Sequence, residues 1–271
     1  MSFKRKFAVI GNPIDHSLSP KIHKLFAEEL GKDITYEAIM VEKEVFEFKV
    51  NRLFEEGYEG LNVTLPLKEL AFDYAHTLSE DSKACGSVNT LWKDGSKVFA
   101  DTTDGRGFVR DLTEKGVVLR DKEIIILGAG GSARAIIPSL LRQDPGRVTI
   151  GNRTRSKAEA LANQFSSPTN RINVVDLSQD LNFIPDLIVN STSAGILKED
   201  VVIPKNLFSK QAQVYDLSYS RFDTPFIELA MQSGVEKCYD GIGMLIHQAA
   251  LSFEIWTGET PSINFGKKDL L

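Results

Sequence analysis

A lysine and an aspartate stand beside predicted strand ends, where both could meet a polar ligand. Lys68 closes the run Asn62-Val63-Thr64-Leu65-Pro66-Leu67-Lys68, and Asp104 lies in the polar break Thr102-Thr103-Asp104-Gly105. A lysine ammonium can donate a proton to an oxygen within hydrogen-bond reach, and a neighbouring carboxylate orients the ammonium and favours its charged form. Each residue also has a simpler explanation, since most lysines lie on helix surfaces and Asp104 could cap a helix beginning near Gly105.

Further polar side chains lie where a ligand could contact them. Ser17 and Ser19 are separated by one residue, so both hydroxyls could reach one carboxylate, although Ser19 could equally be the N-cap of the helix that follows. Gln248 interrupts an otherwise apolar helical stripe. A buried amide needs a hydrogen-bond partner, which is either a ligand or the backbone within the core.

A glycine-rich turn between a predicted strand and a predicted helix could bind a pyrophosphate. The strand over 123–127 runs directly into Gly128-Ala129-Gly130-Gly131-Ser132-Ala133. Glycines let the backbone approach a pyrophosphate, whose charge is stabilised by free N–H groups and the helix dipole, and Ala133 allows close packing of helix on strand. The motif alone is a weak signal, because an ordinary strand-to-helix turn can carry the same glycines.

The end of the next predicted strand indicates which dinucleotide such a turn would take. NAD sites place an acidic residue there, whereas an arginine accommodates the 2′-phosphate of NADP. The chain has Gly151-Asn152-Arg153-Thr154-Arg155-Ser156-Lys157 at this point, without a carboxylate. We expect Arg153 to bind the phosphate through paired donors, with Arg155 and Lys157 adding positive charge. Because cations at a helix N-terminus oppose the helix dipole unless an anion joins them, the pattern favours NADP over NAD.

Composition and charge exclude several other classes. The length of 271 residues, with 42% hydrophobic and 25% charged residues, is ordinary for a globular protein of one or two domains. The net charge of −5 provides no overall positive field for nucleic acid or an anionic membrane. Cys85 and Cys238 are too few for a disulfide framework, and no Cys/His spacing indicates a metal, so we expect a reduced cytoplasmic compartment and no metal site. The apolar run at 7–10 is too short for a signal peptide or a membrane span.

Alternating strands and helices must position these residues. Short apolar runs rich in Val, Ile and Tyr alternate with amphipathic stretches, which is typical of βα units and parallel sheets. Strands are predicted at 7–10, 36–41, 60–65, 87–92, 97–101, 123–127, 148–151, 172–175, 187–190 and 214–217. Helices are predicted at 19–31, 45–56, 67–76, 108–115, 131–142, 157–165 and 241–258. Asp94-Gly95 predicts a hairpin turn, and the second half of the chain is predicted to form a doubly wound sheet.

The motifs taken together resemble the shikimate dehydrogenase family, and the resemblance covers nearly the whole chain. Besides the glycine turn, the motifs are Ser17-Leu18-Ser19, Asn62-Val63-Thr64-Leu65-Pro66-Leu67-Lys68, Val88-Asn89-Thr90, Thr103-Asp104-Gly105, Asn152-Arg153-Thr154, Asn190-Ser191-Thr192-Ser193-Ala194-Gly195, Asp216-Leu217-Ser218-Tyr219, Gly241-Ile242-Gly243-Met244-Leu245 and Gln248-Ala249-Ala250. The family implies a reversible, NADPH-dependent reduction of 3-dehydroshikimate to shikimate, in the biosynthesis of chorismate and the aromatic amino acids.

The resemblance also implies roles for individual residues. Lys68 and Asp104 would be the catalytic pair. Substrate contacts would fall on Ser17, Ser19, Asn62, Thr64, Asn89, Tyr219 and Gln248. Cofactor contacts would fall on Gly128, Ala129, Gly130, Gly131, Ser132, Ala133, Asn152, Arg153, Thr154, Lys157, Thr192, Ser193, Leu217, Gly241 and Met244.

The implied architecture is α/β with two domains of unequal kind. We expect residues 1–103 and 240–271 to form a mixed α/β substrate-binding catalytic domain, and 104–239 a Rossmann-like NADP-binding domain, with a cleft between them. The expected partners are a small-molecule substrate and NADP, with no nucleic acid and no membrane, in a monomer or homodimer. Two alternatives stay open: a quinate/shikimate dehydrogenase that uses NAD, and a non-catalytic NADP-binding regulator on the same fold.

Overall fold

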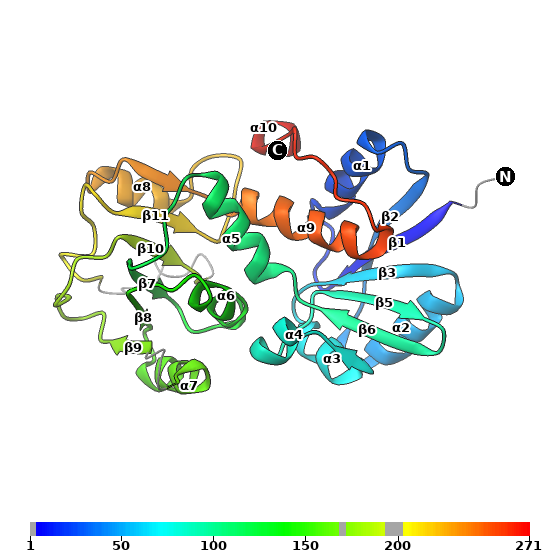
Figure 1. The fold of residues 1–271 in the computed structure, drawn as a ribbon, viewed down its shortest axis with the longest axis horizontal. Helices are drawn as coiled ribbons and strands as arrows, with labels where there is room; N and C mark the ends of the chain where they lie inside the picture. The colour runs from blue at the N-terminus through cyan, green and yellow to red at the C-terminus, as the bar shows by residue number, and fades with distance from the viewer. Residues whose placement is uncertain (1–3, 168–171, 193–202) are drawn as a thin grey trace. The chain divides into compact units, whose positions relative to one another are not determined.

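The computed structural model describes residues 4–167, 172–192 and 203–271, and the chain divides into two compact units (Figure 1). The first unit consists of Met1–Gly107 with Leu245–Leu270, and the second of Phe108–Met244 with Leu271. The sequence predicts that the chain passes from the first domain to the second at 103/104 and back at 239/240. The observed crossings between the units, at 107/108 and 244/245, lie four and five residues later. Both observed crossings fall inside the first turns of helices, α5 (Asp104–Glu114) and α9 (Ile242–Thr257).

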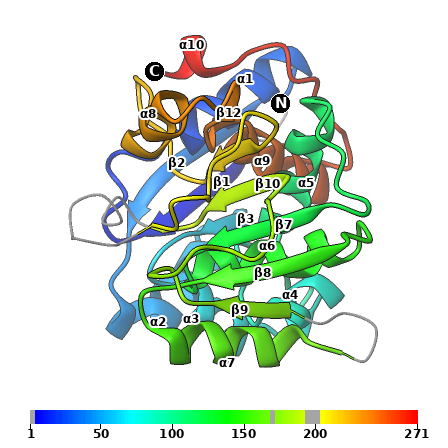
Figure 2. The ribbon, with the colours of Figure 1, turned by 90° about the vertical axis from the view of Figure 1, so that its left-hand side faces the viewer.

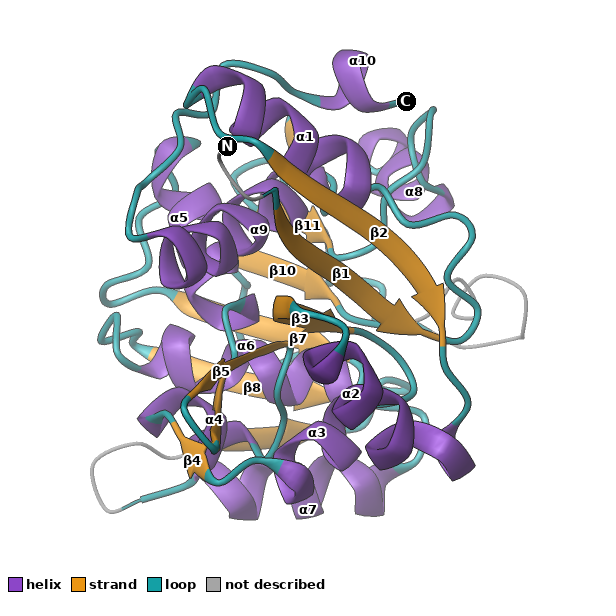
Figure 3. Ribbon diagram, turned by 90° about the vertical axis from the view of Figure 1, so that its right-hand side faces the viewer, coloured by secondary structure: helices purple, strands orange, loops and turns teal. Residues whose placement is uncertain are grey.

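The first unit is built on a mixed six-stranded sheet with the order β2-β1-β3-β5-β6-β4. Its strands are β1 (Arg5–Gly11), β2 (Ile34–Met40), β3 (Tyr58–Val63), β4 (Thr77–Leu78), β5 (Thr90–Asp94) and β6 (Lys97–Asp101). Its helices, besides most of α9, are α1 (Ser19–Glu29), the 3-10 helix η1 (Lys43–Val45), α2 (Phe46–Glu55), α3 (Lys68–Tyr74), α4 (Glu80–Cys85) and α10 (Lys267–Leu270). Strand β1 pairs in parallel with β2 (Figure 3) and with β3. Strand β5 is antiparallel to β3 and β6 (Figure 1).

Both faces of this sheet are covered. On one face, alternate residues of β1 and β3 such as Ile10 and Leu61 pack with Val50 and Leu53 of α2 in one buried cluster. On the other face, Phe7 of β1 stacks on Trp256 of α9 at 4.9 Å between ring centroids. A Cβ at position 60 would lie 2.3 Å from the Trp256 indole nitrogen, so the glycine in β3 is what lets this large ring lie against the sheet.

The second unit contains a parallel sheet with the order β12-β11-β10-β7-β8-β9 (Figure 2). Its strands are β7 (Glu123–Leu127), β8 (Arg147–Gly151), β9 (Ile172–Val175), β10 (Leu187–Asn190), β11 (Gln213–Asp216) and β12 (Lys237–Tyr239). Its helices, besides most of α5, are α6 (Gly131–Leu141), α7 (Arg155–Phe165) and α8 (Pro225–Gln232). This is the doubly wound Rossmann order. The chain adds β8 and β9 on one side of β7 and then β10, β11 and β12 on the other side. Ligands bind beyond the carboxyl ends of the strands where the order switches, between β7 and β10.

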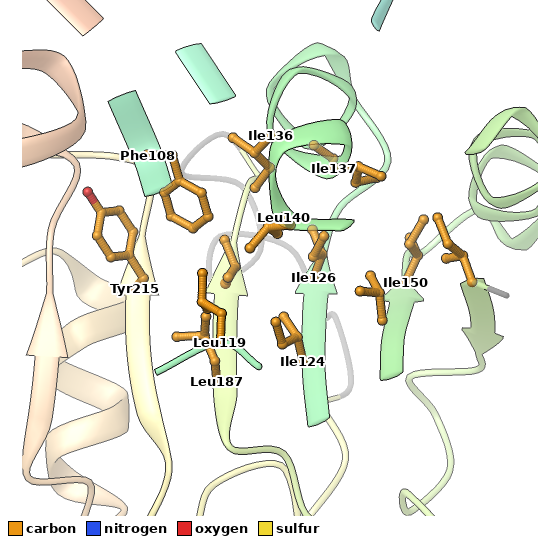
Figure 4. Packing of buried hydrophobic residues seen from close by; sticks show 14 of the residues in the cluster. Phe108, Leu119, Ile124, Ile126, Ile136, Ile137, Leu140, Ile150, Leu187 and Tyr215 are labelled. Carbon is orange, nitrogen blue, oxygen red and sulfur yellow. The ribbon is translucent and has the colours of Figure 1, made fainter. Parts of the chain in front are cut away.

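Strand β7 is buried on both of its faces, as is typical of a strand in a parallel sheet. Ile124 and Ile126 pack into a cluster with Ile136 and Leu140 of α6 (Figure 4). Ile125 and Leu127 point the other way, into a separate cluster on the opposite face. A strand whose two faces are both covered has a continuous run of apolar residues, as β7 does from Ile124 to Leu127.

Several short elements were not predicted, although the sequence carries signals for two of them. Helix α4 begins after Ser79, whose hydroxyl accepts a hydrogen bond from Ser82 N, and ends at Gly86, whose φ is 64°. Helix α8 has the same kind of start, because Thr224 accepts from Ile227 N and is followed by a proline. Helix α5 begins at Asp104, four residues before the predicted start, because the polar break itself forms the first turn. No helix in the described part of the chain has the length and apolarity to cross a membrane.

Candidate active site

Lys68 and Asp104 form a direct ion pair in the first unit. Lys68 is the first residue of α3 and Asp104 the first of α5, and Nζ of the lysine lies 2.5 Å from Oδ2 of the aspartate. The lysine side chain is 24% exposed and the aspartate only 8%. The ammonium therefore remains accessible to a ligand while the carboxylate holds it from within, which is not the arrangement of an ordinary surface lysine.

Asn89 holds the other oxygen of Asp104. Its Nδ2 donates to Asp104 Oδ1 at 2.9 Å and to Gln248 Oε1 at 3.1 Å. Its Oδ1 accepts from the backbone N–H of Thr103 at 2.9 Å, which fixes the orientation of the amide. Each carboxylate oxygen of Asp104 thus has its own donor, and Asn89 links the aspartate to the glutamine.

Gln248 combines the two explanations that its sequence position allows. Its Nε2 donates to the backbone oxygen of Leu245 at 2.9 Å, while its Oε1 accepts from Asn89. In the contacts of the described chain this uses one of the two amide N–H groups and leaves the other for a ligand. A Cβ at position 107 would lie 2.7 Å from Gln248 N, so Gly107 lets α5 approach this residue closely.

The expected carboxylate-binding serines follow β1 and the expected contact Thr64 follows β3, so both lie beyond the carboxyl ends of neighbouring parallel strands. Ser19 is the first residue of α1 and is 7% exposed, but it does not cap that helix, because the N-cap position is Leu18 and no side chain caps it. The N-cap explanation of Ser19 is therefore wrong. Ser17 Oγ accepts from Ser19 N at 3.3 Å. A Cβ on Gly11, at the end of β1, would lie 2.4 Å from Thr64 Cγ2, so the loops after β1 and β3 are neighbours.

Asn62 belongs to the same hydrogen-bonded network. Its Oδ1 accepts from the Tyr36 hydroxyl at 2.7 Å, and its Nδ2 donates to Asn89 O at 3.0 Å and to Ser252 Oγ at 2.9 Å. Neither Tyr36 nor Ser252 was singled out from the sequence. Of the expected substrate contacts, only Tyr219 lies in the second unit, after β11, with 37% of its surface exposed.

The glycine turn of the second unit has the geometry of an anion site. Gly128 has a φ of 106°, which favours glycine, and a Cβ there would lie 2.6 Å from Ser191 Oγ at the end of β10. Helix α6 begins at Gly131 with Gly130 as its N-cap, without a side-chain cap and without an acidic residue in its first turn. Gly130, Gly131 and Ser132 are exposed while Ala133 is buried against the sheet. Uncapped N–H groups therefore face outward where a phosphate could accept from them.

The residues after β8 retain a positive character, with one change from the expectation. Arg153, Thr154 and Lys157 are exposed, and the first turn of α7 contains no acidic residue. Asn152 Nδ2 donates to Thr154 O at 2.9 Å, which shapes the turn. Arg155, however, donates to Glu159 at 2.8 Å, one helical turn on, so part of its charge is neutralised within α7.

A buried aspartate organises the ends of β10 and β11. Asp216 Oδ1 accepts from Asn190 Nδ2 at 3.0 Å, and Oδ2 accepts from the Thr224 hydroxyl at 2.6 Å. Burial raises the pKa of Asp216, and the hydrogen bonds from Thr224 and its neighbours act in the opposite direction. Asn190 Oδ1 in turn accepts from the Thr192 hydroxyl at 2.7 Å, and Asn190 O accepts from Leu217 N at 2.9 Å. Thr192 and Leu217 are thereby held together beside the glycine turn, whereas Ser193 lies outside the described residues.

The start of α9 is anchored to β11. A Cβ on Gly241 would lie 2.1 Å from Leu217 O, so the chain passes β11 at a distance that only glycine permits. Met244 N donates to the Tyr215 hydroxyl at 3.3 Å, and that hydroxyl donates to Asp111 at 2.6 Å. The two remaining expected cofactor contacts, Gly241 and Met244, are therefore fixed in the second unit. Among the described residues, no group of three or more His, Cys, Asp and Glu side chains could hold a metal ion.

The chain is similar in sequence to known protein families and to curated proteins. Models described as shikimate dehydrogenase substrate binding domain, shikimate / quinate 5-dehydrogenase, and shikimate 5′-dehydrogenase C-terminal domain match residues 9–91, 111–220 and 241–265. The shikimate dehydrogenase (NADP(+)) of Vibrio atlanticus strain LGP32 is 43% identical over 98% of this chain and 95% of its own length.

Two solved structures extend the comparison to three dimensions. Shikimate 5-dehydrogenase from Thermus thermophilus, in complex with NADP(H) and shikimate, has a TM-score of 0.86 and 32% identity, covering 98% of this chain and 97% of that one. The Listeria monocytogenes enzyme, in complex with shikimate and NAD, has a TM-score of 0.86 and 28% identity, covering 96% and 94%. The chain belongs to the shikimate dehydrogenase family.

Proposed function

We propose that the chain is an NADP-dependent shikimate dehydrogenase, which reduces 3-dehydroshikimate to shikimate reversibly in the biosynthesis of chorismate and the aromatic amino acids. The observation that carries the proposal is the accessible Lys68 ammonium paired with the buried Asp104 carboxylate. The unit that contains this pair would bind the substrate, and the unit with the Rossmann sheet would bind NADP.

Lys68 would act as the proton donor in the reductive direction. When NADPH is bound it supplies the hydride for the carbonyl carbon. The Lys68 ammonium donates its proton to the carbonyl oxygen, which becomes the new hydroxyl, and the resulting amine takes a proton back from solvent. Asp104 keeps the ammonium oriented, and Asn89 keeps Asp104 in place, so the donor needs no rearrangement as negative charge develops on the oxygen.

The remaining polar side chains fit a small polyol acid. Such a ligand presents one carboxylate and several hydroxyls, and each buried group left unpaired costs about 1–3 kcal/mol. Ser17 and Ser19 supply hydroxyls for the carboxylate, and Gln248 supplies an N–H for a ring oxygen. Asn62 uses both of its N–H groups on the protein, so we expect it to accept from a substrate hydroxyl through Oδ1.

The second unit fits a dinucleotide with a 2′-phosphate. The uncapped start of α6 would accept the pyrophosphate, and Arg153 and Lys157 would bind the 2′-phosphate. The Listeria neighbour was solved with NAD, so cofactor preference is part of the test.

One assay tests the proposal and its alternatives together. Purified protein is mixed with shikimate or quinate and with NADP+ or NAD+, and reduced nucleotide is followed at its absorbance maximum. We expect the highest kcat/KM with shikimate and NADP+. A preference for NAD+ or quinate would favour the quinate/shikimate alternative, and no turnover of either acid would favour the non-catalytic regulator.

We further expect a monomer or homodimer acting in the cytoplasm, where the free cysteines Cys85 and Cys238 stay reduced.

A further inference from the structure

A histidine and a tyrosine stack directly behind the residues expected to bind the substrate. His23 lies in α1 and Tyr36 in β2, with 4.0 Å between ring centroids and 9° between ring planes. Phe253 and Trp256 of α9 flank the histidine ring at 6.0 and 5.5 Å. The tyrosine ring is thus held against a fixed aromatic surface.

The Tyr36 hydroxyl contacts Asn62, one of the expected substrate-binding residues. It donates to Asn62 Oδ1 at 2.7 Å. Burial raises the pKa of Tyr36 well above its ordinary value, and a hydrogen-bonding interaction with the Ser19 side chain acts in the opposite direction. The phenol therefore keeps its proton and serves as a permanent donor to Asn62.

Asn62 depends on this donor. The asparagine is 6% exposed, and both of its N–H groups already point to Asn89 O and Ser252 Oγ. Without the tyrosine hydroxyl, a buried carbonyl oxygen would lose a partner, and the amide would shift toward another donor. Since Asn89 also contacts Asp104 and Gln248, the tyrosine stands at the outer end of the network that reaches the catalytic pair.

His23 contributes the face of its ring and no charge. It is fully buried, and neither ring nitrogen has a hydrogen-bond partner in the described structure. Burial lowers the pKa of His23 to about 3, against a smaller opposing effect of the Asn62 side chain. At neutral pH the ring is uncharged and acts by packing.

We propose that Tyr36 is a positioning residue of the substrate site. Its hydroxyl holds Asn62 in the geometry that binds the substrate, and the His23 ring holds Tyr36 against Asn62. This rests on the proposed function, because Asn62 matters here as a contact for a hydroxyl of shikimate. Since the tyrosine shapes binding groups and touches no reacting atom, its loss should raise KM for shikimate much more than it lowers kcat.

The test compares two tyrosines with nearly identical hydrogen bonds. Tyr36→Phe removes the 2.7 Å bond to Asn62, and Tyr74→Phe removes a 2.8 Å bond from Tyr74 to Asn51 on the exposed side of the same unit. We expect Tyr36→Phe to raise KM for shikimate about 10-fold, with kcat and KM for NADP+ within about twofold of wild type. Tyr74→Phe should leave all three within about twofold.

A double-mutant cycle tests the route through Asn62. In an Asn62→Ala background, Tyr36→Phe should change kcat/KM by less than about twofold, because its partner is gone. An undiminished 10-fold effect in that background would overturn the assignment to Asn62. Wild-type KM in Tyr36→Phe would overturn the positioning role itself.

Two histidine variants keep the proposal testable should Tyr36→Phe fail to fold. His23→Phe retains a flat ring and should leave KM for shikimate within about threefold, whereas His23→Leu removes it and should raise KM about fivefold or more. Equal KM values in the two would overturn the role of the stack. The proposed function fails separately, since wild-type protein that neither turns over nor binds shikimate by calorimetry would end both proposals, while an active wild type with an unaffected Tyr36→Phe ends only this one.

Discussion

Asn89 donates to the oxygen of Asp104 that Lys68 does not contact. The Asn89 Nδ2 to Asp104 Oδ1 distance is 2.9 Å, and the lysine lies at 2.5 Å from Oδ2. The same asparagine nitrogen reaches Gln248 Oε1 at 3.1 Å. One amide therefore sets both the direction of the carboxylate and the distance from it to the glutamine.

Asn89→Ala should impair catalysis more than any loss of a single substrate contact would suggest. The change leaves Asp104 Oδ1 and Gln248 Oε1 each short of a donor in a buried setting. We expect kcat/KM for shikimate to fall about 100-fold, with a loss of about 2 kcal/mol in the free energy of unfolding. Asn51→Ala, at the exposed Tyr74 contact, is the matched control and should change kcat/KM by less than about twofold.

Lys68→Ala should abolish most turnover without weakening the cofactor. The variant lacks the proton donor, so we expect kcat to fall roughly 10³-fold. Lys68 lies in the first unit and the glycine turn in the second, so the Kd for NADPH, measured by its fluorescence, should stay within about twofold of wild type. Unchanged turnover would remove Lys68 from the mechanism.

Arg153 and Arg155 should differ in their effect on nucleotide choice. Arg153→Ala should raise KM for NADP+ about 10- to 100-fold and KM for NAD+ by less than about threefold, because only NADP+ carries the phosphate. Arg155 is paired with Glu159, so Arg155→Ala should have a smaller effect on NADP+. Equal losses with both nucleotides in Arg153→Ala would contradict a 2′-phosphate contact.

His23 should make the protein less stable as the pH falls. Its folded-state pKa is lowered to about 3 by burial, whereas an unfolded histidine titrates near 6.5. Between these values the unfolded chain binds a proton that the folded chain excludes, so the free energy of unfolding decreases with decreasing pH, by about 2 kcal/mol from pH 8 to pH 5. Urea unfolding at both pH values should show this decrease in wild type and a decrease smaller by about that amount in His23→Phe and His23→Leu. Parallel pH dependence in all three proteins would contradict the assignment.

The sequence predicts the second unit well because its signals are local. The strand predicted at 123–127 contains the unbroken apolar run Ile124–Leu127 between a glutamate and a glycine, and the structure has the same strand bounds. The strand that begins the hairpin was predicted from 87 and begins at Thr90. Asn89 still pairs through its backbone, donating to Asp101 O at 3.1 Å and accepting from Val63 N at 2.8 Å. Its side chain, however, is diverted into hydrogen bonds with Thr103 and Asp104. A pattern of residue types does not show such a diversion.

The stack of His23 and Tyr36 behind the proposed substrate site could not be predicted either, because it also depends on contacts between residues far apart in the sequence. His23 and Tyr36 are 13 positions apart on a helix and a strand, and only their packing brings the rings together. A polar residue on the inner face of α1, beside buried Ile22 and Phe26, is the one sequence signal that could have drawn attention to it. The pairing of Arg155 with Glu159, by contrast, follows directly from their i, i+4 spacing.

The bare N-terminus of α6 couples the stability of the second unit to its metabolic surroundings. With glycine at the N-cap, the start of α6 forgoes only a few tenths of a kcal/mol relative to a serine or aspartate cap, but its free N–H groups stay available to a bound phosphate. Any ligand that binds only the folded state adds to this by mass action, about 2.7 kcal/mol at 100 times its Kd. In a cell depleted of nucleotide, the same helix start would leave this unit easier to melt and to digest, so the lifetime of the protein would follow the supply of its cofactor.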